Sequence, residues 1–232
     1  PVWPIEEKPV PQTSVPGEKT SPTQPFPALP EAYVRQGVTE DDLVDFTPAL
    51  RAEAIEIAKQ YTLGPLFTPP PVFGEGGKKG VIQSPSAAGG INWGGAGYDP
   101  ETDTLFIEAS NAYSLAHVSP GNKDRGVQAD YLILGPRALN GPQGLPLFKP
   151  PYSVVVGLSL QTGKVVWSVP HGQGPTDHPA IKDLNLGPLG WPSHGMLSSG
   201  GPLVTKTLLF VNQVQIAADF VSPSKELYMR AF

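Results

Sequence analysis

The segment GLSLQTGKVVW, residues 157–167, carries the pattern that decides the expected fold, and GYDPETDTLFI, residues 97–107, aligns with it without gaps. Both have a small first residue, a short polar third residue, threonine sixth, a turn-forming seventh residue and a large apolar eleventh residue. Glycine tolerates positive φ, and a short polar side chain can bond the turn backbone, so each segment suits a tight hairpin. A repeated hairpin whose last residue packs on a neighbour indicates propeller blades rather than a sandwich. We therefore predict equivalent hairpins in neighbouring sheets.

The surrounding composition also favours many short strands. The chain has 26 glycines and 29 prolines in 232 residues, well above the usual share of about 12%. Apolar runs lie between the glycine and proline clusters, a pattern typical of all-β proteins. The expected strands cover 81–83, 105–109, 153–160, 165–169, 203–205 with 208–211, and 227–230, with long loops at 119–151 and 171–200.

Two stretches depart from this pattern. Residues 1–37 are punctuated by proline, which fixes φ and donates no ladder bond, so we expect extended irregular chain pinned by Trp3, Phe26 and Tyr33. Disorder is the alternative for this stretch. Residues 38–64 are expected to form a short helical insertion between strands, with Thr47 as N-cap and proline at the first helical position.

Charge and composition exclude several classes of protein. The net charge is -5 and the pI about 5.3, without the basic patch of a nucleic-acid binder. No apolar run reaches the roughly 20 residues that span a bilayer. There is no cysteine for a disulfide or thiolate site. Residues 1–4 do not read as a signal peptide, so the signal of an exported parent would lie upstream.

Most polar motifs fail the tests for a site. The histidines, expected as solvated loop residues, lack metal-ligand spacing: His117, His171, His178 and His194. Residues 74–80 are rich in glycine but are followed by an apolar strand pattern instead of the helix of a phosphate loop. Asp99 is expected to bond a turn rather than calcium.

The repeat resembles a known family. TGKVVW, residues 162–167, is similar to the second half of the tryptophan-docking motif of quinoprotein dehydrogenases. That motif begins with alanine and has aspartate third, whereas Gly157 and Ser159 stand here. The most diagnostic likeness is GGINWGG, residues 89–95, followed by Tyr-Asp-Pro. Further similar segments of glucose-dehydrogenase-like members are 1–12, 21–27, 64–70, 200–205 and 227–232.

The resemblance implies that residues 1–232 form part of an eight-bladed propeller, about three to four blades, without its N-terminal blades and C-terminal end. The parent would be a periplasmic dehydrogenase that uses pyrroloquinoline quinone (PQQ) and Ca²⁺. It would oxidise a sugar, polyol or alcohol hydroxyl and pass electrons to ubiquinone or a cytochrome c. An inner-membrane anchor of the parent is left open, and no nucleic-acid partner is expected.

The same resemblance supplies the site residues. The catalytic aspartate and the calcium ligands belong to blades that precede Trp3, so no catalytic or metal-binding residue is expected here. Asn92 is expected to hydrogen-bond the cofactor and Trp93 to form part of its pocket wall. Packing of this pair in a buried turn is the alternative. Some relatives have a cofactor-binding asparagine a few residues earlier, but residues 86–88 read Ser-Ala-Ala. Trp167 is expected to pack between blades.

Two other classes of function remain open: a non-catalytic propeller that acts as a scaffold or binding module, and a free-standing carbohydrate-binding β domain. Asn92 and Trp93 favour the enzyme, because a scaffold needs no axial polar and aromatic pair. A partial propeller leaves sheet edges unpaired, so the isolated chain is expected to be inactive and either poorly soluble or partly unfolded.

Overall fold

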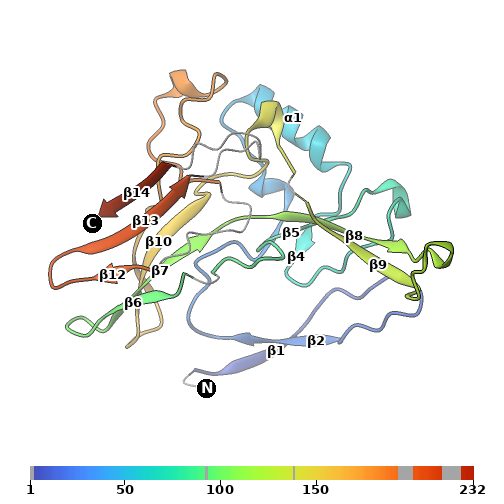
Figure 1. Cartoon of the computed structure of the whole chain (residues 1–232), viewed down its shortest axis with the longest axis horizontal. Coiled ribbons are helices and arrows are strands. Elements are labelled where there is room, and N and C mark those ends of the chain that lie inside the picture. Colours follow the sequence, from blue (N-terminus) through green and yellow to red (C-terminus); the bar gives the residue numbers. More distant parts are fainter. Residues whose placement is uncertain (1–2, 92–93, 138, 193–200, 216–225) are drawn as a thin grey trace. The chain divides into compact units, whose positions relative to one another are not determined.

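The computed structural model describes residues 3–91, 94–137, 139–192, 201–215 and 226–232 (Figure 1). These residues fall into two compact units. Unit 1 comprises residues 1–27, 35–87 and 113–149, and unit 2 comprises residues 28–34, 88–112 and 150–232. Each unit is described by itself.

Unit 2 is built from two antiparallel sheets. The first has the strand order β11-β10-β7-β6, and the second has the order β12-β13-β14. The strands are β6 (Ala96–Asp99), β7 (Thr104–Ser110), β10 (Ser153–Ser159), β11 (Val165–Pro170), β12 (Leu203–Val204), β13 (Leu209–Gln215) and β14 (Glu226–Ala231).

The two repeat segments form hairpins, as their pattern predicts. Residues 97–107 cover β6, a turn and β7, and residues 157–167 cover β10, a turn and β11. The seventh residue of each copy, Asp103 or Gly163, has positive φ, 56° and 69° respectively. The turn chemistry inferred from the sequence is therefore confirmed.

The expectation that these hairpins lie in neighbouring sheets is wrong. β7 pairs with β10 along its whole length, from Thr104 opposite Ser159 to Ser110 opposite Ser153, so both hairpins belong to one sheet. Residues 111–152, which include two strands of unit 1, separate β7 from β10 in the chain. The spacing of the repeat therefore results from the residues inserted between two strands of one sheet, and it does not give the length of a blade.

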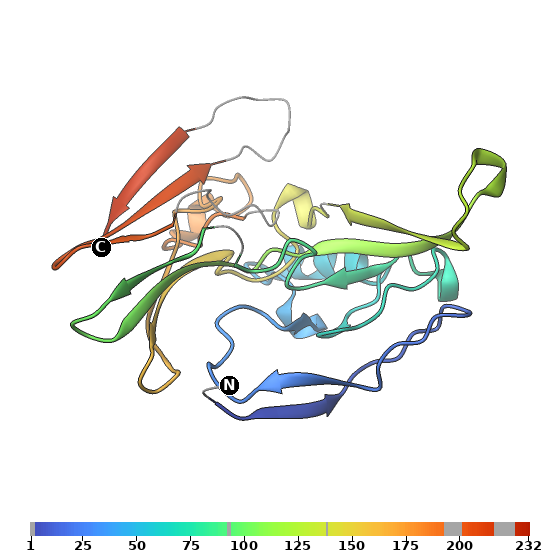
Figure 2. The same cartoon turned by 60° about the horizontal axis from the view of Figure 1, so that its bottom comes forward.

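Unit 1 holds a three-stranded sheet in the order β5-β8-β9 and two ribbons, β1-β2 and β3-β4. Figure 2 shows β8 and β9 as one long hairpin. The elements are β1 (Ile5–Pro9), β2 (Thr23–Pro27), β3 (Gly37–Val38), α1 (Pro48–Ala58), β4 (Gly64–Pro65), β5 (Val81–Gln83), β8 (Ser114–Pro120) and β9 (Tyr131–Arg137). Every pairing between named strands in both units is antiparallel, and the described strands close no barrel. A mostly-β partial propeller with one α-helix among the described residues agrees with the expected fold class.

The β1-β2 ribbon corrects the expectation of irregular chain at the N-terminus. Pro9, Pro25 and Pro27 all fall on the same alternate set of cross-strand pairs. In an antiparallel pair, every second pair directs its N–H and C=O groups away from the partner, so a missing N–H costs no ladder bond there. The remaining pairs can bond, and just beyond the strand the Val10 N–H donates to the Pro22 carbonyl at 3.2 Å.

The helix α1 begins as the sequence predicts. Thr47 accepts a hydrogen bond from the Leu50 N–H at 3.2 Å, and Pro48 is the first helical residue. Leu50, Ala54 and Ala58 are buried on one face. The helix ends at Ala58, within the predicted insertion of residues 38–64, and Gly64 and Pro65 pair with β3 as strand β4.

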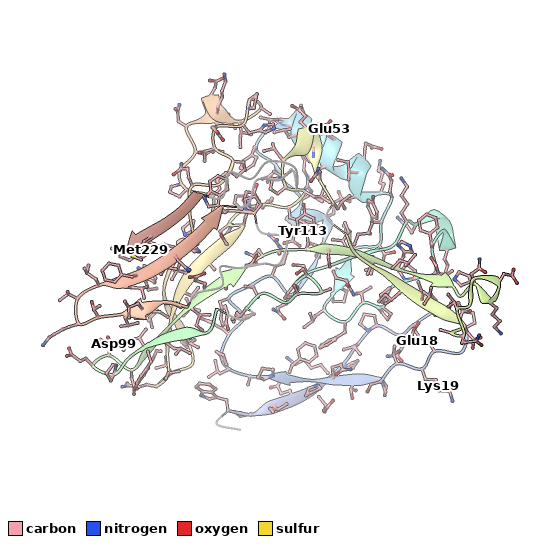
Figure 3. All side chains as sticks on the ribbon, viewed as in Figure 1. Glu18, Lys19, Glu53, Asp99, Tyr113 and Met229 are labelled. Atoms are coloured by element: carbon pink, nitrogen blue, oxygen red, sulfur yellow. The ribbon has the colours of Figure 1, made fainter. Side chains whose placement is uncertain are left out.

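The core of unit 1 surrounds Phe148 and Tyr113, whose rings meet edge to face at 4.8 Å. Figure 3 labels Tyr113 among the packed side chains. The Tyr113 hydroxyl donates to the Leu139 carbonyl at 2.9 Å and accepts from the Leu147 N–H at 2.8 Å. Burial raises the pKa of Tyr113 to about 12.

Replacing Tyr113 with phenylalanine is expected to lower the free energy of unfolding by about 1–2 kcal/mol at neutral pH, because the Leu147 N–H loses its acceptor. The wild type should also lose stability as the pH rises from about 10, the pKa of an unfolded tyrosine, to about 12. The variant should lack that part of the alkaline loss. Denaturant unfolding at pH 8 and above pH 10 tests both effects, and identical pH profiles for the two proteins would contradict them.

Candidate functional site

Asn92 and Trp93 lie outside the described residues, so the site is built from the residues that flank them in unit 2. The preceding stretch ends at Ile91, and Gly94 and Gly95 lead into β6. The Ser110 N–H, at the end of β7, donates to the Gly90 carbonyl at 2.7 Å. Gly90 is therefore fastened to the end of the four-stranded sheet.

Gly90 leaves little room for anything larger. A Cβ atom on Gly90 would lie 3.1 Å from the Ser110 carbonyl oxygen and 3.1 Å from a methyl group of Val34. Such contacts are tighter than nine in ten real Cβ contacts. Gly90 thus packs directly against the end of β7 and the Val34 side chain, in a place where a larger residue would not fit.

A buried acid and base lie in the same sheet. Glu108 on β7 and His171 just after β11 are 2% and 4% exposed, and Nδ1 of His171 lies 3.9 Å from Oε2 of Glu108. The His171 N–H donates to the Ser153 carbonyl at 2.9 Å, and the Ser153 hydroxyl donates to the His171 carbonyl at 3.1 Å. When His171 is protonated, the two side chains form a buried ion pair next to the start of β10.

The expectation of solvated histidines is wrong for two of the four. His171 is buried beside Glu108, and His117 is buried in β8, with its ring 4.9 Å from that of Phe73. His178 is partly buried and accepts from the Ala180 N–H at 3.2 Å. His194 lies outside the described residues. The sequence did contain a sign of this burial. Glu108 and His117 lie within apolar strand patterns, and a strand whose two faces are both covered buries its polar side chains as well.

Asp99 bonds its own turn, as predicted. Its carboxylate accepts from the Thr102 hydroxyl at 2.6 Å and from the Glu101 N–H at 3.0 Å, and these bonds lower the pKa of Asp99. Figure 3 shows Asp99 at the β6-β7 end of unit 2. Among the described residues, no three His, Asp or Glu side chains gather to hold a metal ion.

Trp167 packs between the two sheets of unit 2. Its ring meets Phe106 at 6.0 Å and Phe232 at 5.7 Å, both edge to face. It adjoins a cluster around buried Val155 of the first sheet and Val211 of the second. The predicted packing role of Trp167 is confirmed.

The residues 86–88 that replace the asparagine of some relatives contribute no amide side chain. In unit 1, Ser86 is buried and the Ala87 N–H donates to the Ser114 hydroxyl at 3.1 Å. This part of the expected pocket therefore differs chemically from the family pattern. Among the described residues the α-helix is α1, whose 11 residues are too few to span a bilayer.

The antiparallel sheets, none of which closes into a barrel among the described strands, agree with a partial β-propeller. All 232 residues match the family described as glucose/ethanol/alcohol dehydrogenase, β-propeller domain, which bears the label PQQ. The chain belongs to this family.

Curated relatives point to the same group of enzymes. The chain is 30% identical to a quinoprotein glucose dehydrogenase of Gluconobacter oxydans (strain 621H), in an alignment that covers 100% of this chain and 29% of that protein. It is 26% identical to a probable quinate dehydrogenase (quinone) of Xanthomonas campestris pv. juglandis, with the same coverage. It is 28% identical to a glycerol dehydrogenase large subunit of Gluconobacter thailandicus, over 93% of this chain and 32% of that protein.

The chain thus spans about 29% of the length of the first two relatives. No solved structure shows a significant match.

Proposed function

We propose that this chain is part of a PQQ-dependent dehydrogenase that oxidises a hydroxyl group of a sugar, polyol or other alcohol. The observation that carries the proposal is the family match over residues 1–232. Relatives named for glucose, quinate and glycerol support a polyhydroxylated substrate.

Within this enzyme, the chain contributes blades and part of the cofactor pocket. Bound PQQ would supply a two-electron acceptor. Asn92 would donate a hydrogen bond to a cofactor oxygen, and Trp93 would cover a face of the ring and exclude water. The hydrogen bond from the Ser110 N–H to the Gly90 carbonyl fixes the chain two residues before this pair.

We propose that the calcium ligands and the general base lie in other parts of the enzyme. No cluster of carboxylates among the described residues fits Ca²⁺, and we assign no calcium ligand or general base to this chain. We further propose that the enzyme works in the periplasm and passes electrons to ubiquinone or a cytochrome c. These assignments rest on the family likeness.

Asn92→Ala is expected to weaken PQQ binding about tenfold, the value of one lost hydrogen bond of about 1.4 kcal/mol. The measurement is a fluorescence titration of the complete gene product with PQQ in the presence of Ca²⁺. Asn122→Ala, in the exposed loop between β8 and β9, is the matched control and should bind as the wild type does.

Dye reduction with glucose, glycerol and quinate then ranks the substrates. A complete gene product that binds no PQQ and reduces no dye would favour the scaffold reading. Residues 1–232 alone are expected to reduce no dye, because the sheets of a partial propeller keep unpaired edges.

A further inference from the structure

One face of the four-stranded sheet of unit 2 changes from apolar to polar along its strands. Directly opposite residues of neighbouring strands share a face, as do alternate residues of one strand. The register therefore gives three rows across this face: Phe106, Gly157 and Trp167; then Glu108, Val155 and Val169; then Ser110, Ser153 and His171, which follows β11. The polar side chains of the second and third rows are all buried. A buried carboxylate and a buried imidazole thus lie on the two sides of β10.

The charges of Glu108 and His171 can compensate each other. Taking a single charge out of water is costly, and an opposite charge at close range offsets that cost. Nδ1 of His171 lies 3.9 Å from Oε2 of Glu108. The attraction exists only while the carboxyl group is ionised and the imidazole is protonated. Imidazole is the side chain that ordinarily changes its charge between about pH 5 and 8, so the strength of this contact depends on pH.

His171 also stands at the base of a loop, residues 171–191. Backbone hydrogen bonds close this base: the N–H groups of Leu189, Gly190 and Trp191 donate to the carbonyls of Gln173, Gly172 and His171 at 2.9, 3.0 and 3.0 Å. The base is also bonded to the start of β10, where the His171 N–H donates to the Ser153 carbonyl and the Tyr152 N–H donates to the Leu189 carbonyl. The contact with Glu108 adds a link to β7.

We propose that Glu108 and His171 form a pH-sensitive latch, which fastens the base of the loop of residues 171–191 to β7 across β10. The latch is closed while both side chains are charged. It opens as the pH rises and His171 loses its proton, because the Glu108 carboxylate then faces a neutral ring. Opening loosens the base of the loop and leaves the ladder between β7 and β10 in place.

Other ionisable residues near the latch can be separated from it. Tyr152 adjoins Ser153, and a phenol ordinarily stays neutral below about pH 10. His178 lies farther along the loop and accepts from the Ala180 N–H at 3.2 Å. Arg230 pairs with Val211 in the second sheet and is therefore included in the test. The loop itself has exposed charges at Asp177, Lys182 and Asp183.

Hydrogen exchange of the complete gene product, followed by mass spectrometry on peptides that cover residues 171–191, tests the latch. At about pH 6, Glu108→Gln and His171→Gln are each expected to speed exchange of the loop-base amides about tenfold over the wild type. The double variant should exchange no faster than either single variant, because both changes remove the same contact. His178→Gln is the matched control: alone it should exchange as the wild type does, and with Glu108→Gln its effect should be additive.

The pH dependence gives a second readout. Rates are divided by the intrinsic chemical exchange rate at each pH. The excess of Glu108→Gln over the wild type should then shrink between about pH 6 and pH 9, as the wild-type latch opens. An excess that stays constant over this range overturns the pH sensitivity.

A combined variant covers a failure of the single variants to fold. Glu108→Leu with His171→Leu replaces the whole pair, a change that buried ion pairs generally tolerate better than the loss of one partner. This variant should fold, and exchange of its loop base should not depend on pH once the intrinsic rate is removed. A loop base that still responds to pH in this variant contradicts the latch.

Two further outcomes would also overturn the proposal. The first is additivity of Glu108→Gln and His171→Gln. The second is a coupling between them that vanishes in an Arg230→Gln background, which would give the carboxylate a different partner. Neither outcome involves PQQ, so both leave the proposed function intact.

Discussion

Trp167→Ala is expected to lower the local free energy of unfolding in unit 2 by about 3 kcal/mol. The variant loses the ring contacts with Phe106 and Phe232 and leaves a space beside Val155 and Val211. The value lies at the low end for a large aromatic, because Trp167 is partly exposed and lines an open groove of about 420 Å³. The variant therefore removes packing between the two sheets of unit 2.

Val166→Ala is the control for this prediction. Val166 precedes Trp167 in β11 and is 61% exposed. Its replacement should change the free energy of unfolding by no more than about 0.5 kcal/mol. Hydrogen exchange followed by mass spectrometry, on peptides that cover β10 and β13, reads the opening of each sheet locally. Equal protection in Trp167→Ala and Val166→Ala would show that the aromatic contact does not hold the sheets together.

Phe148→Ala is expected to be more damaging, at about 4 kcal/mol, and to act on unit 1. The Phe148 side chain is 1% exposed, meets Tyr113 edge to face at 4.8 Å, and lies 5.5 Å from the Arg35 guanidinium. The variant would leave a cavity between α1 and the strands. Tyr113 and Arg35 could not move to fill it, because both side chains are hydrogen-bonded to the backbone.

Phe73→Ala is the control, because it also removes a phenylalanine ring, but one that is 55% exposed. The free energy of unfolding should fall by less than about 1 kcal/mol. Exchange of the amides of α1 and of residues 139–149 gives the comparison. A loss at Phe148 no larger than the loss at Phe73 would mean that the core of unit 1 lies elsewhere.

Local chemistry predicted local structure well. Val81–Gln83 forms a strand with the expected bounds, Thr47 caps the helix, and both repeat turns have positive φ at the seventh residue. Each of these features depends on a few neighbouring residues, whose steric and hydrogen-bonding preferences are visible in the sequence.

Pairing between distant segments could not be foreseen. The strands β8 and β9 extend into a region expected to be a loop, because Tyr131–Leu134 lacks the alternation of a half-buried strand and only its partner makes it one. The placement of both hairpins in a single sheet likewise depends on the pairing of β7 with β10, which the spacing of the repeat does not reveal.

The candidate site was likewise predicted only in part. Asn92 and Trp93 were predicted from family likeness, since nothing in their local pattern alone separates a cofactor contact from a packed turn. The buried pair Glu108 and His171 was missed, because it forms only when β7 and β11 take their places on either side of β10 in one sheet.

A crystal structure of the complete gene product with PQQ bound would show whether residues 92 and 93 contact the cofactor. We expect the Asn92 side-chain amide within about 3.2 Å of a cofactor oxygen, and the Trp93 ring in van der Waals contact with the cofactor. A structure in which PQQ binds away from residues 89–95, or in which that loop faces the outer rim of the propeller, would contradict this expectation.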